Sequence, residues 1–265
     1  YVYQYVLNMS FPHAVVIKLD QKLEHSAIIY LQILRTIFES ERKNKDFNRF
    51  LDFQFLTDQE IRQLRNPNEY LRFKKAFDDN YIYELMRLSF EITHHNTIEH
   101  IAGVHFTAMH VGRQLKASGV PIDLGRISGA AAGHDVGKYG CVGEEQKRVA
   151  YYHYFYTELW FNKFNIPQIG HVALNHSTWD LELENLPLES LVLIYADFRV
   201  KNNNNGTASR MHIFSLKDSF NVILDKLDNV DEDKEKRYKR VYAKLKDFED
   251  YMISKGVDIN LISSE

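Results

Sequence analysis

The chain of 265 residues is long enough to bury a substantial core, and its 45% hydrophobic and 26% charged residues are ordinary for a globular protein. A formal net charge of -3 excludes a general attraction to nucleic acid or to anionic membranes, so no DNA partner is expected. The single cysteine, Cys141, excludes a disulfide framework within the chain. With no apolar run long enough to cross a bilayer, these features predict a cytoplasmic protein without a membrane segment.

The start of the chain carries neither a start methionine nor the basic region of a signal peptide. Together with the abrupt end at Glu265, this predicts a piece of a larger multidomain protein.

Helices are the elements that the sequence predicts almost throughout. Only five prolines are present, and few β-branched runs alternate, so we expect an all-α fold. Capping boxes, in which a hydroxyl and a carboxylate satisfy the first helical amides, are expected at Thr57 with Glu60 and at Ser215 with Asp218. Apolar residues at three- and four-residue steps predict helices over 21–41, 69–92, 97–116, 123–135, 148–164, 168–175, 188–200, 215–227 and 238–252.

The last of these helices has an apolar stripe through Val241, Leu245, Phe248 and Met252. Packing against the rest of the chain is the preferred interpretation of this stripe, and a seam in a homodimer is the alternative. Gly256 is expected to end the helix.

Twelve histidines are the reason to look for a functional site. His134 and Asp135 are adjacent and end a helix of small residues, where Gly137 is expected to relax the backbone so that both side chains converge. Imidazole with carboxylate suits divalent iron, manganese, zinc or cobalt. Lys138 follows one turn later and places a cation where an anionic oxygen would lie.

Four further polar residues surround this pair in the sequence. His100 shares a helix face with Val104, which predicts a buried imidazole that needs a partner. His153 lies near the start of one helix and His176 near the end of another, while Asp197 ends an apolar helix with a carboxylate that is costly to bury unpaired. No glycine-rich phosphate loop occurs in the sequence.

The order His, His-Asp, His, His, Asp resembles that of the HD phosphohydrolase superfamily, over about 97–201 or roughly two-fifths of the chain. The closest resemblance is to the bacterial HD-type diadenosine tetraphosphate hydrolases. Cyclic-dinucleotide phosphodiesterases share the skeleton, but their second tandem histidine would fall at Asn175 and no Gly-Tyr-Pro follows Asp180. A third metal ion is therefore not implied. The segments that carry the resemblance are 100–104, 134–138, 152–153, 175–178 and 195–197.

The resemblance implies a set of metal ligands and a reaction. One divalent ion would be held by His100, His134, Asp135 and Asp197, and a second by His153 and His176, with Asp135 bridging. The ions, one or two of Fe, Mn, Co, Zn or Mg, would activate a water molecule to hydrolyse a small phosphorylated substrate, expected to be a nucleotide such as a diadenosine polyphosphate. Asp135 and Lys138 are the expected catalytic residues, and the expected substrate-binding residues are Lys138, His171 and Arg199.

The resemblance implies an HD metal-binding core over 91–201. The regions that it does not cover are expected to be an N-terminal helical extension over 1–90 and a C-terminal helical appendage over 202–265.

Other readings of the same residues stay open. A cyclic-(di)nucleotide phosphodiesterase is one, and an inactive HD module that senses a nucleotide is another. Inositol oxygenase has a di-iron site with the same six-ligand order, including the lysine, so a di-iron oxygenase is a third. Single histidines have plainer interpretations: His94 and His95 as solvated or capping residues, and His105 as a core residue in preference to a substrate contact.

Overall fold

The computed structural model describes residues 1–93, 96–177, 185–202, 210–226 and 231–261. These residues form twelve α-helices, five short 3-10 helices and one two-stranded antiparallel sheet. The predicted all-α fold class is thereby confirmed. Within the described residues, no helix combines the length and the apolar character that crossing a membrane requires.

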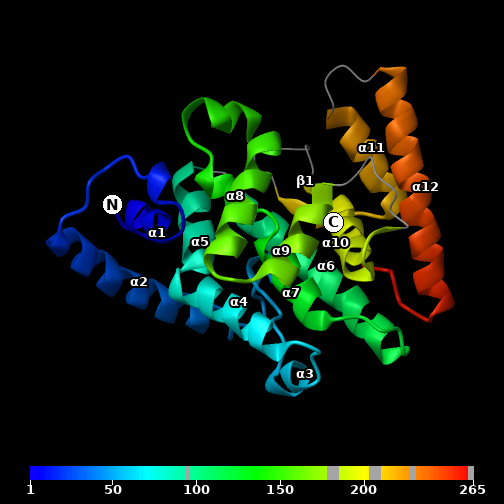
Figure 1. Cartoon of the computed structure of the whole chain (residues 1–265), viewed down its shortest axis with the longest axis horizontal. Coiled ribbons are helices and arrows are strands. Elements are labelled where there is room, and N and C mark those ends of the chain that lie inside the picture. The colour runs from blue at the N-terminus through cyan, green and yellow to red at the C-terminus, as the bar shows by residue number, and fades with distance from the viewer. Residues whose placement is uncertain (94–95, 178–184, 203–209, 227–230, 262–265) are drawn as a thin grey trace.

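The elements follow one another in a single run along the chain (Figure 1). The α-helices are α1 (Val2–Ser10), α2 (Gln21–Glu41), α3 (Asp58–Arg62), α4 (Pro67–Asp79), α5 (Ile82–Thr93), α6 (Thr97–Ala117), α7 (Leu124–Gly133), α8 (Val149–Lys163), α9 (Pro167–Leu174), α10 (Leu188–Arg199), α11 (Leu216–Lys226) and α12 (Glu232–Ser254). The 3-10 helices are η1 (Pro12–Ala14), η2 (Arg49–Leu51), η3 (Val136–Gly140), η4 (Gly143–Arg148) and η5 (Asn175–Ser177), and the strands are β1 (Val200–Asn202) and β2 (Met211–Ile213).

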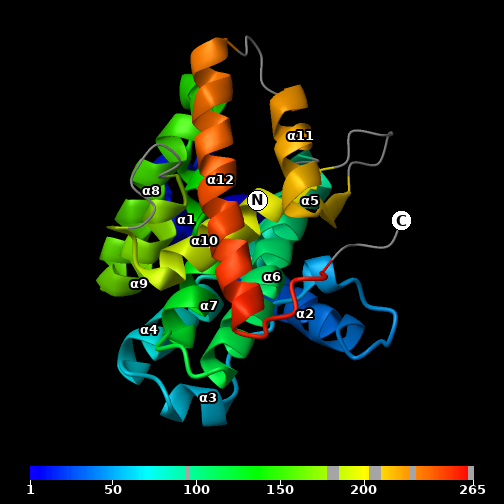
Figure 2. The ribbon, with the colours of Figure 1, turned by 90° about the vertical axis from the view of Figure 1, so that its right-hand side faces the viewer.

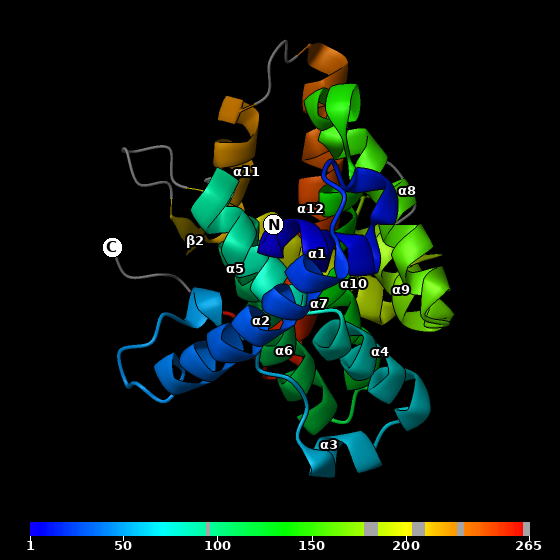
Figure 3. The same ribbon diagram turned by 90° about the vertical axis from the view of Figure 1, so that its left-hand side faces the viewer.

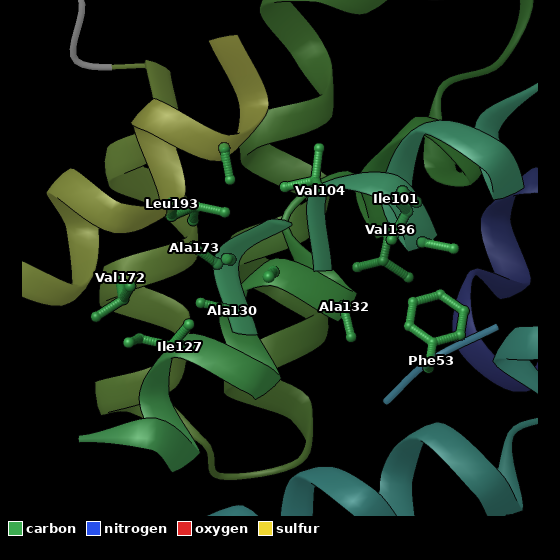
Figure 4. Close-up of a cluster of buried hydrophobic side chains, with 14 of the residues drawn as sticks. Phe53, Ile101, Val104, Ile127, Ala130, Ala132, Val136, Val172, Ala173 and Leu193 are labelled. Atoms are coloured by element: carbon green, nitrogen blue, oxygen red, sulfur yellow. The ribbon is translucent and has the colours of Figure 1, made fainter. Parts of the chain in front are cut away.

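Helices α6, α7 and α10 form the centre of the fold, and α9 covers α7 from the other side (Figures 1 and 4). α6 buries Ile101 and Val104 completely, and α7 buries Ile127, which packs against Gly112 of α6. Small residues let these helices approach closely: a side chain on Gly129 of α7 would overlap Ile169 of α9. The packed centre gives the polar residues of these helices fixed positions.

The prediction of one long helix over 69–92 is wrong, because this stretch forms two helices, α4 and α5. Asn80 ends α4, and its side-chain amide donates to the carbonyl of Ala76 at 2.7 Å. Tyr81 then takes a left-handed conformation with φ of 51°, which no α-helix accommodates. The apolar period continues across this break, so the period alone did not reveal it.

The N-terminal segment forms a helix that the sequence did not predict, α1, which lies against α2 and α5 (Figure 3). Distant residues hold this segment. Trp160 of α8 donates to Ser10 Oγ at 3.2 Å, Lys163 donates to the carbonyl of Met9 at 2.6 Å, and His13 donates to the carbonyl of Gly140 at 2.8 Å. α1 is therefore fastened to α8, and η1 to η3.

The apolar stripe of α12 packs within the chain, as preferred, against α10 and α11 (Figure 2). Its residues Val241, Leu245, Phe248 and Met252 are buried. The helix ends before Gly256, whose φ is 77°, in agreement with the predicted cap. The capping box at Thr57 with Glu60 is present. At Ser215 half of the predicted box forms: the hydroxyl accepts from the Asp218 amide at 3.1 Å, while the Asp218 carboxylate accepts from that hydroxyl at 2.6 Å.

The hairpin of β1 and β2 was not predicted, since its strands are only three residues long. Buried hydrophobic side chains from 1–90, 91–201 and 202–265 belong to one cluster, which extends from Val6 to Val257.

Candidate metal centre

The His-Asp pair lies where α7 ends and η3 begins. His134 directly follows Gly133, the last residue of α7, and Asp135 precedes Val136, the first of η3. The next glycine, Gly137, serves close packing: a side chain there would overlap the main chain of α8 at His153 and Thr157. Its φ is not in the left-handed region, so space and not backbone freedom explains this glycine, contrary to the expectation from the sequence.

One side of the site gathers His100, His134 and two carboxylates. His100 Nε2 lies 3.1 Å from Asp197 Oδ1 and 3.4 Å from Asp135 Oδ2. His134 Nε2 lies 3.4 Å from the same oxygen of Asp135. The donor atoms of His100, His134 and Asp135 are all close enough to one another to surround a single ion. These groups come from α6, α7 with its following turn, and α10.

The other side gathers two histidines around the second oxygen of Asp135. Asp135 Oδ1 lies 3.3 Å from His153 Nε2 and 3.8 Å from His176 Nε2, and the two imidazole nitrogens are 3.3 Å apart. These three residues form a second group that is able to hold an ion. Asp135 belongs to both groups through different oxygens, which is the geometry of a bridging carboxylate.

Three of the imidazoles are oriented by main-chain carbonyls. His134 Nδ1–H donates to the carbonyl of Ala131 at 2.9 Å. In the same way His153 donates to the carbonyl of Val149 at 2.7 Å, and His176 to that of Ala173 at 2.5 Å. A proton fixed on Nδ1 leaves the lone pair on Nε2, and the Nε2 atoms are the ones that converge on Asp135. This outer hydrogen bond is the usual support of a metal-bound histidine.

His134 Nε2 tests directly whether the site fits a metal ion. The side chain is fully buried, and this nitrogen has no hydrogen-bond partner among the described residues. A buried acceptor without a donor is costly, and a metal ion would satisfy it. The donor set therefore fits a divalent ion.

Burial keeps three of the histidines, His134, His153 and His176, neutral. It lowers the pKa of His153 and of His176 to about 4, and it also lowers the pKa of His134, although the charge of Asp135 opposes it in each case. Neutral imidazole is the form that binds metals. The three lone pairs are therefore available at neutral pH.

The carboxylates stay ionised for the opposite reason. Burial alone raises the pKa of Asp135, but the Lys138 ammonium, whose Nζ lies 2.5 Å from Oδ2, holds that pKa well below its ordinary value. Burial likewise acts against Asp197, and Lys201 with His100 keeps its pKa low. Two buried anions among neutral imidazoles form a site that attracts cations.

Two residues expected to bind substrate lie elsewhere. His171 is exposed on α9, and its described contact is with Asn175, at 3.5 Å. Arg199 is buried, and its guanidinium donates to Tyr195 and to the carbonyls of Phe214, Ile259 and Leu261 at 2.7–3.0 Å. The structure therefore corrects the expectation for Arg199, which fastens the C-terminal segment in place of a phosphate.

Thr157 is a residue of the site that the sequence did not single out. Its hydroxyl donates to the carbonyl of His134 at 3.2 Å and accepts from the amide of Gly137 at 3.1 Å, so it joins both sides of the His-Asp turn to α8. It follows His153 by four residues, and this spacing on one helix face was the available signal. Lys201 also belongs to the site: its ammonium donates to the main-chain carbonyl of Asp197 at 2.6 Å and lies 3.4 Å from Asp197 Oδ1.

His105 lies in the core, as preferred, with Nε2 3.0 Å from Ser128 Oγ. The expectations for His94, His95, Thr178 and Asp180 fall on positions outside the described residues.

The chain was compared with protein families, curated proteins and solved structures. No protein family, no curated protein and no solved structure matches the chain.

Proposed function

We propose that the chain is a metal-dependent phosphohydrolase of the HD type that cleaves a phosphoester or phosphoanhydride bond of a nucleotide. The observation that carries the proposal is the pair of donor groups that share Asp135, one with His100 and His134 and one with His153 and His176. The same residues carry the resemblance in the sequence. Metal-binding groups alone suit many reactions, so the reaction class is the part that experiment must test.

The residues present fit one or two divalent ions. His100, His134, Asp135 and Asp197 would hold the first, and His153 and His176 the second, with Asp135 between them. Ions bound there supply an ionised water at neutral pH and positive charge beside the phosphoryl group. Imidazole and carboxylate accept Fe, Mn, Co, Zn or Mg, so the ligand types leave the metal open.

Lys138 acts on the substrate in this proposal. Its ammonium lies at Asp135 Oδ2, at the edge of the donor groups, and part of the side chain is exposed. An anionic phosphate oxygen that approaches Asp135 therefore meets this cation first. Lys138 would bind and orient that oxygen, and the partly buried setting strengthens the attraction.

Cys141 has no part in the chemistry. It is buried, and burial raises the pKa of its thiol to about 11, which leaves it protonated and unreactive.

We also propose a cytoplasmic location, because a single reduced cysteine fits that compartment.

A substrate panel tests the proposal. Metal-stripped protein is reloaded separately with Mn, Fe(II), Co, Zn and Mg and given diadenosine polyphosphates, cyclic dinucleotides, cyclic mononucleotides and nucleoside phosphates. We expect metal-dependent cleavage of one class, absent in Asp135→Ala and retained in His105→Leu, which alters a buried histidine outside the site. No cleavage of any class, with two irons bound and dioxygen consumed, would replace the phosphohydrolase with an oxygenase.

A further inference from the structure

A cavity of about 450 Å³ opens beside the metal centre, on the side of the N-terminal segment. One wall consists of residues from the first sixteen positions, among them Tyr3, Leu7 and Val16. Much of the remaining lining comes from η3 and the residues that follow it, including Lys138 and Val142. A cavity of this size holds a small organic molecule.

Three lining residues connect this cavity to the donor groups. Lys138 has its ammonium on Asp135 Oδ2. Thr97 begins α6, one turn before His100. Val149 supplies the carbonyl that orients His153. A molecule in the cavity therefore has one end at the candidate metal centre.

The charge of the lining decides what the cavity accepts. Among the described residues that line it, Lys138 alone carries a formal charge at neutral pH. A single phosphoryl group has this one cation beside it. A further anionic group deeper inside would have no opposite charge, and its desolvation would be costly. The part of the ligand inside the cavity must therefore be uncharged.

The uncharged part of the lining combines aromatic, apolar and amide side chains, and this combination suits a flat, polar ring system. Tyr3 and Tyr139 contribute aromatic rings, and Leu7 contributes an apolar surface. Gln4 and Gln146 bring amide groups that donate and accept hydrogen bonds. A nucleoside offers the matching surfaces, since its base has two apolar faces and a polar edge and its sugar carries hydroxyls.

We propose that this cavity binds the nucleoside of a nucleotide substrate whose phosphoryl group lies at Lys138, and that residues 1–16 thereby select the substrate. The inference rests on the proposed function and extends it to the N-terminal segment. That wall is held before any ligand arrives, because Gln4 Oε1 accepts from the amide of Val16 at 2.8 Å and His13 fastens the segment to Gly140. A wall fixed in advance loses little entropy on binding.

Val16 allows a test with a close control. Its side chain lines the cavity yet is 81% exposed, so a larger residue there is compatible with folding. Ile17 is its neighbour, 41% exposed and outside the lining. The variants Val16→Trp and Ile17→Trp add similar bulk to one segment, and only the first places it at the cavity.

The experiment measures binding and turnover separately. Equilibrium dialysis of adenosine, guanosine, cytidine, uridine and their 5′-monophosphates against metal-stripped protein gives affinity without catalysis. We expect at least one monophosphate to bind, and Val16→Trp to weaken it about tenfold or more with no change in Ile17→Trp. Lys138→Ala should remove the preference for the monophosphate over its nucleoside. With metal, Val16→Trp should raise KM for the nucleotide and leave kcat and metal content unchanged.

The outcomes separate the two proposals. Equal binding by both tryptophan variants, or hydrolysis of phosphate esters without nucleoside-dependent binding, overturns the cavity assignment and leaves the phosphohydrolase in place. Binding that depends on Val16 in a protein that hydrolyses no phosphate ester supports the cavity and overturns the proposed reaction. Neither binding nor hydrolysis overturns both.

Discussion

Two histidines on one helix, the half-buried His100 and the buried His105 of α6, lie in different chemical surroundings. His105 is packed against the rings of Phe53 and Phe55, and its Nε2 meets the hydroxyl of Ser128, which in turn lies 3.1 Å from Tyr70 OH. These contacts are with neutral groups. His100 lies instead within 3.4 Å of two ionised carboxylates.

Unsatisfied nitrogens do not distinguish the two regions. His105 Nδ1 and His134 Nε2 are both buried without a hydrogen-bond partner among the described residues. Burial accordingly lowers the pKa of His105 to about 3 and also lowers that of His134. The difference is the neighbouring atoms: aromatic carbon around one imidazole, and a carboxylate with further imidazole nitrogens around the other. A buried histidine thus indicates a metal site only where anions converge on it.

The largest effect is expected from Asp135→Ala, because this residue belongs to both donor groups. Hydrolysis should fall by roughly a thousandfold or more, and neither ion should be retained. Helix content should persist, since α7 and η3 do not depend on this side chain for packing. Turnover assays, metal analysis and circular dichroism measure the three effects. Full activity in this variant would rule out the assignment of the site.

His153→Ala should disrupt one of the two donor groups and leave the other intact. The variant removes a ligand from one group and leaves His100, His134 and Asp135 in the other. We expect one equivalent of metal in place of two, with activity lowered about tenfold to a hundredfold. Metal analysis after dialysis gives the stoichiometry. An unchanged stoichiometry would remove His153 from the ligands.

His105→Leu should have the opposite profile. Loss of the hydrogen bond to Ser128 should destabilise the fold at pH 7 by about 1–3 kcal/mol, while metal content and kcat stay as in the unaltered chain. Urea denaturation and metal analysis provide both readouts. Loss of metal from this variant would contradict the separation of the two regions.

A pH dependence of the free energy of unfolding also belongs to His105. Its pKa falls from 6.5 to about 3 in the folded chain, so between these values the unfolded chain binds the extra proton. Stability therefore decreases as pH falls through this window, by up to about 1.4 kcal/mol per pH unit from this group. In metal-stripped protein, the unaltered chain should lose more stability from pH 7 to pH 4 than His105→Leu does. Equal losses would show that the imidazole protonates without unfolding.

The sequence predicted much of the fold because the signals were local. Apolar spacing located most helices, and the small residues before His134 located the helix end at which the pair converges. The break at Tyr81 escaped because the apolar period continues through it. The strands of the hairpin are too short for their alternation to be recognised.

The candidate site also contains residues that the sequence predicted and residues that it did not. The six groups that converge are those named from their order in the sequence. Arg199, two residues after Asp197, points instead to the carbonyls of Phe214, Ile259 and Leu261, partners that no local pattern predicts. Thr157 and the cavity wall near Val16 likewise depend on contacts between distant segments.

The fastening of the N-terminal segment has a consequence for biosynthesis. The hydrogen bonds from His13, Met9 and Ser10 to the later chain span 127, 154 and 150 positions. At about 5–20 residues per second, α1 leaves the ribosome on the order of ten seconds before its partners on α8 exist. The N-terminal wall of the cavity is thus synthesised before α8, but it can pack in its final position only after a long loop of chain has closed. During that interval Val6 and Leu7, buried in the finished fold, form an exposed apolar patch that a chaperone can recognise.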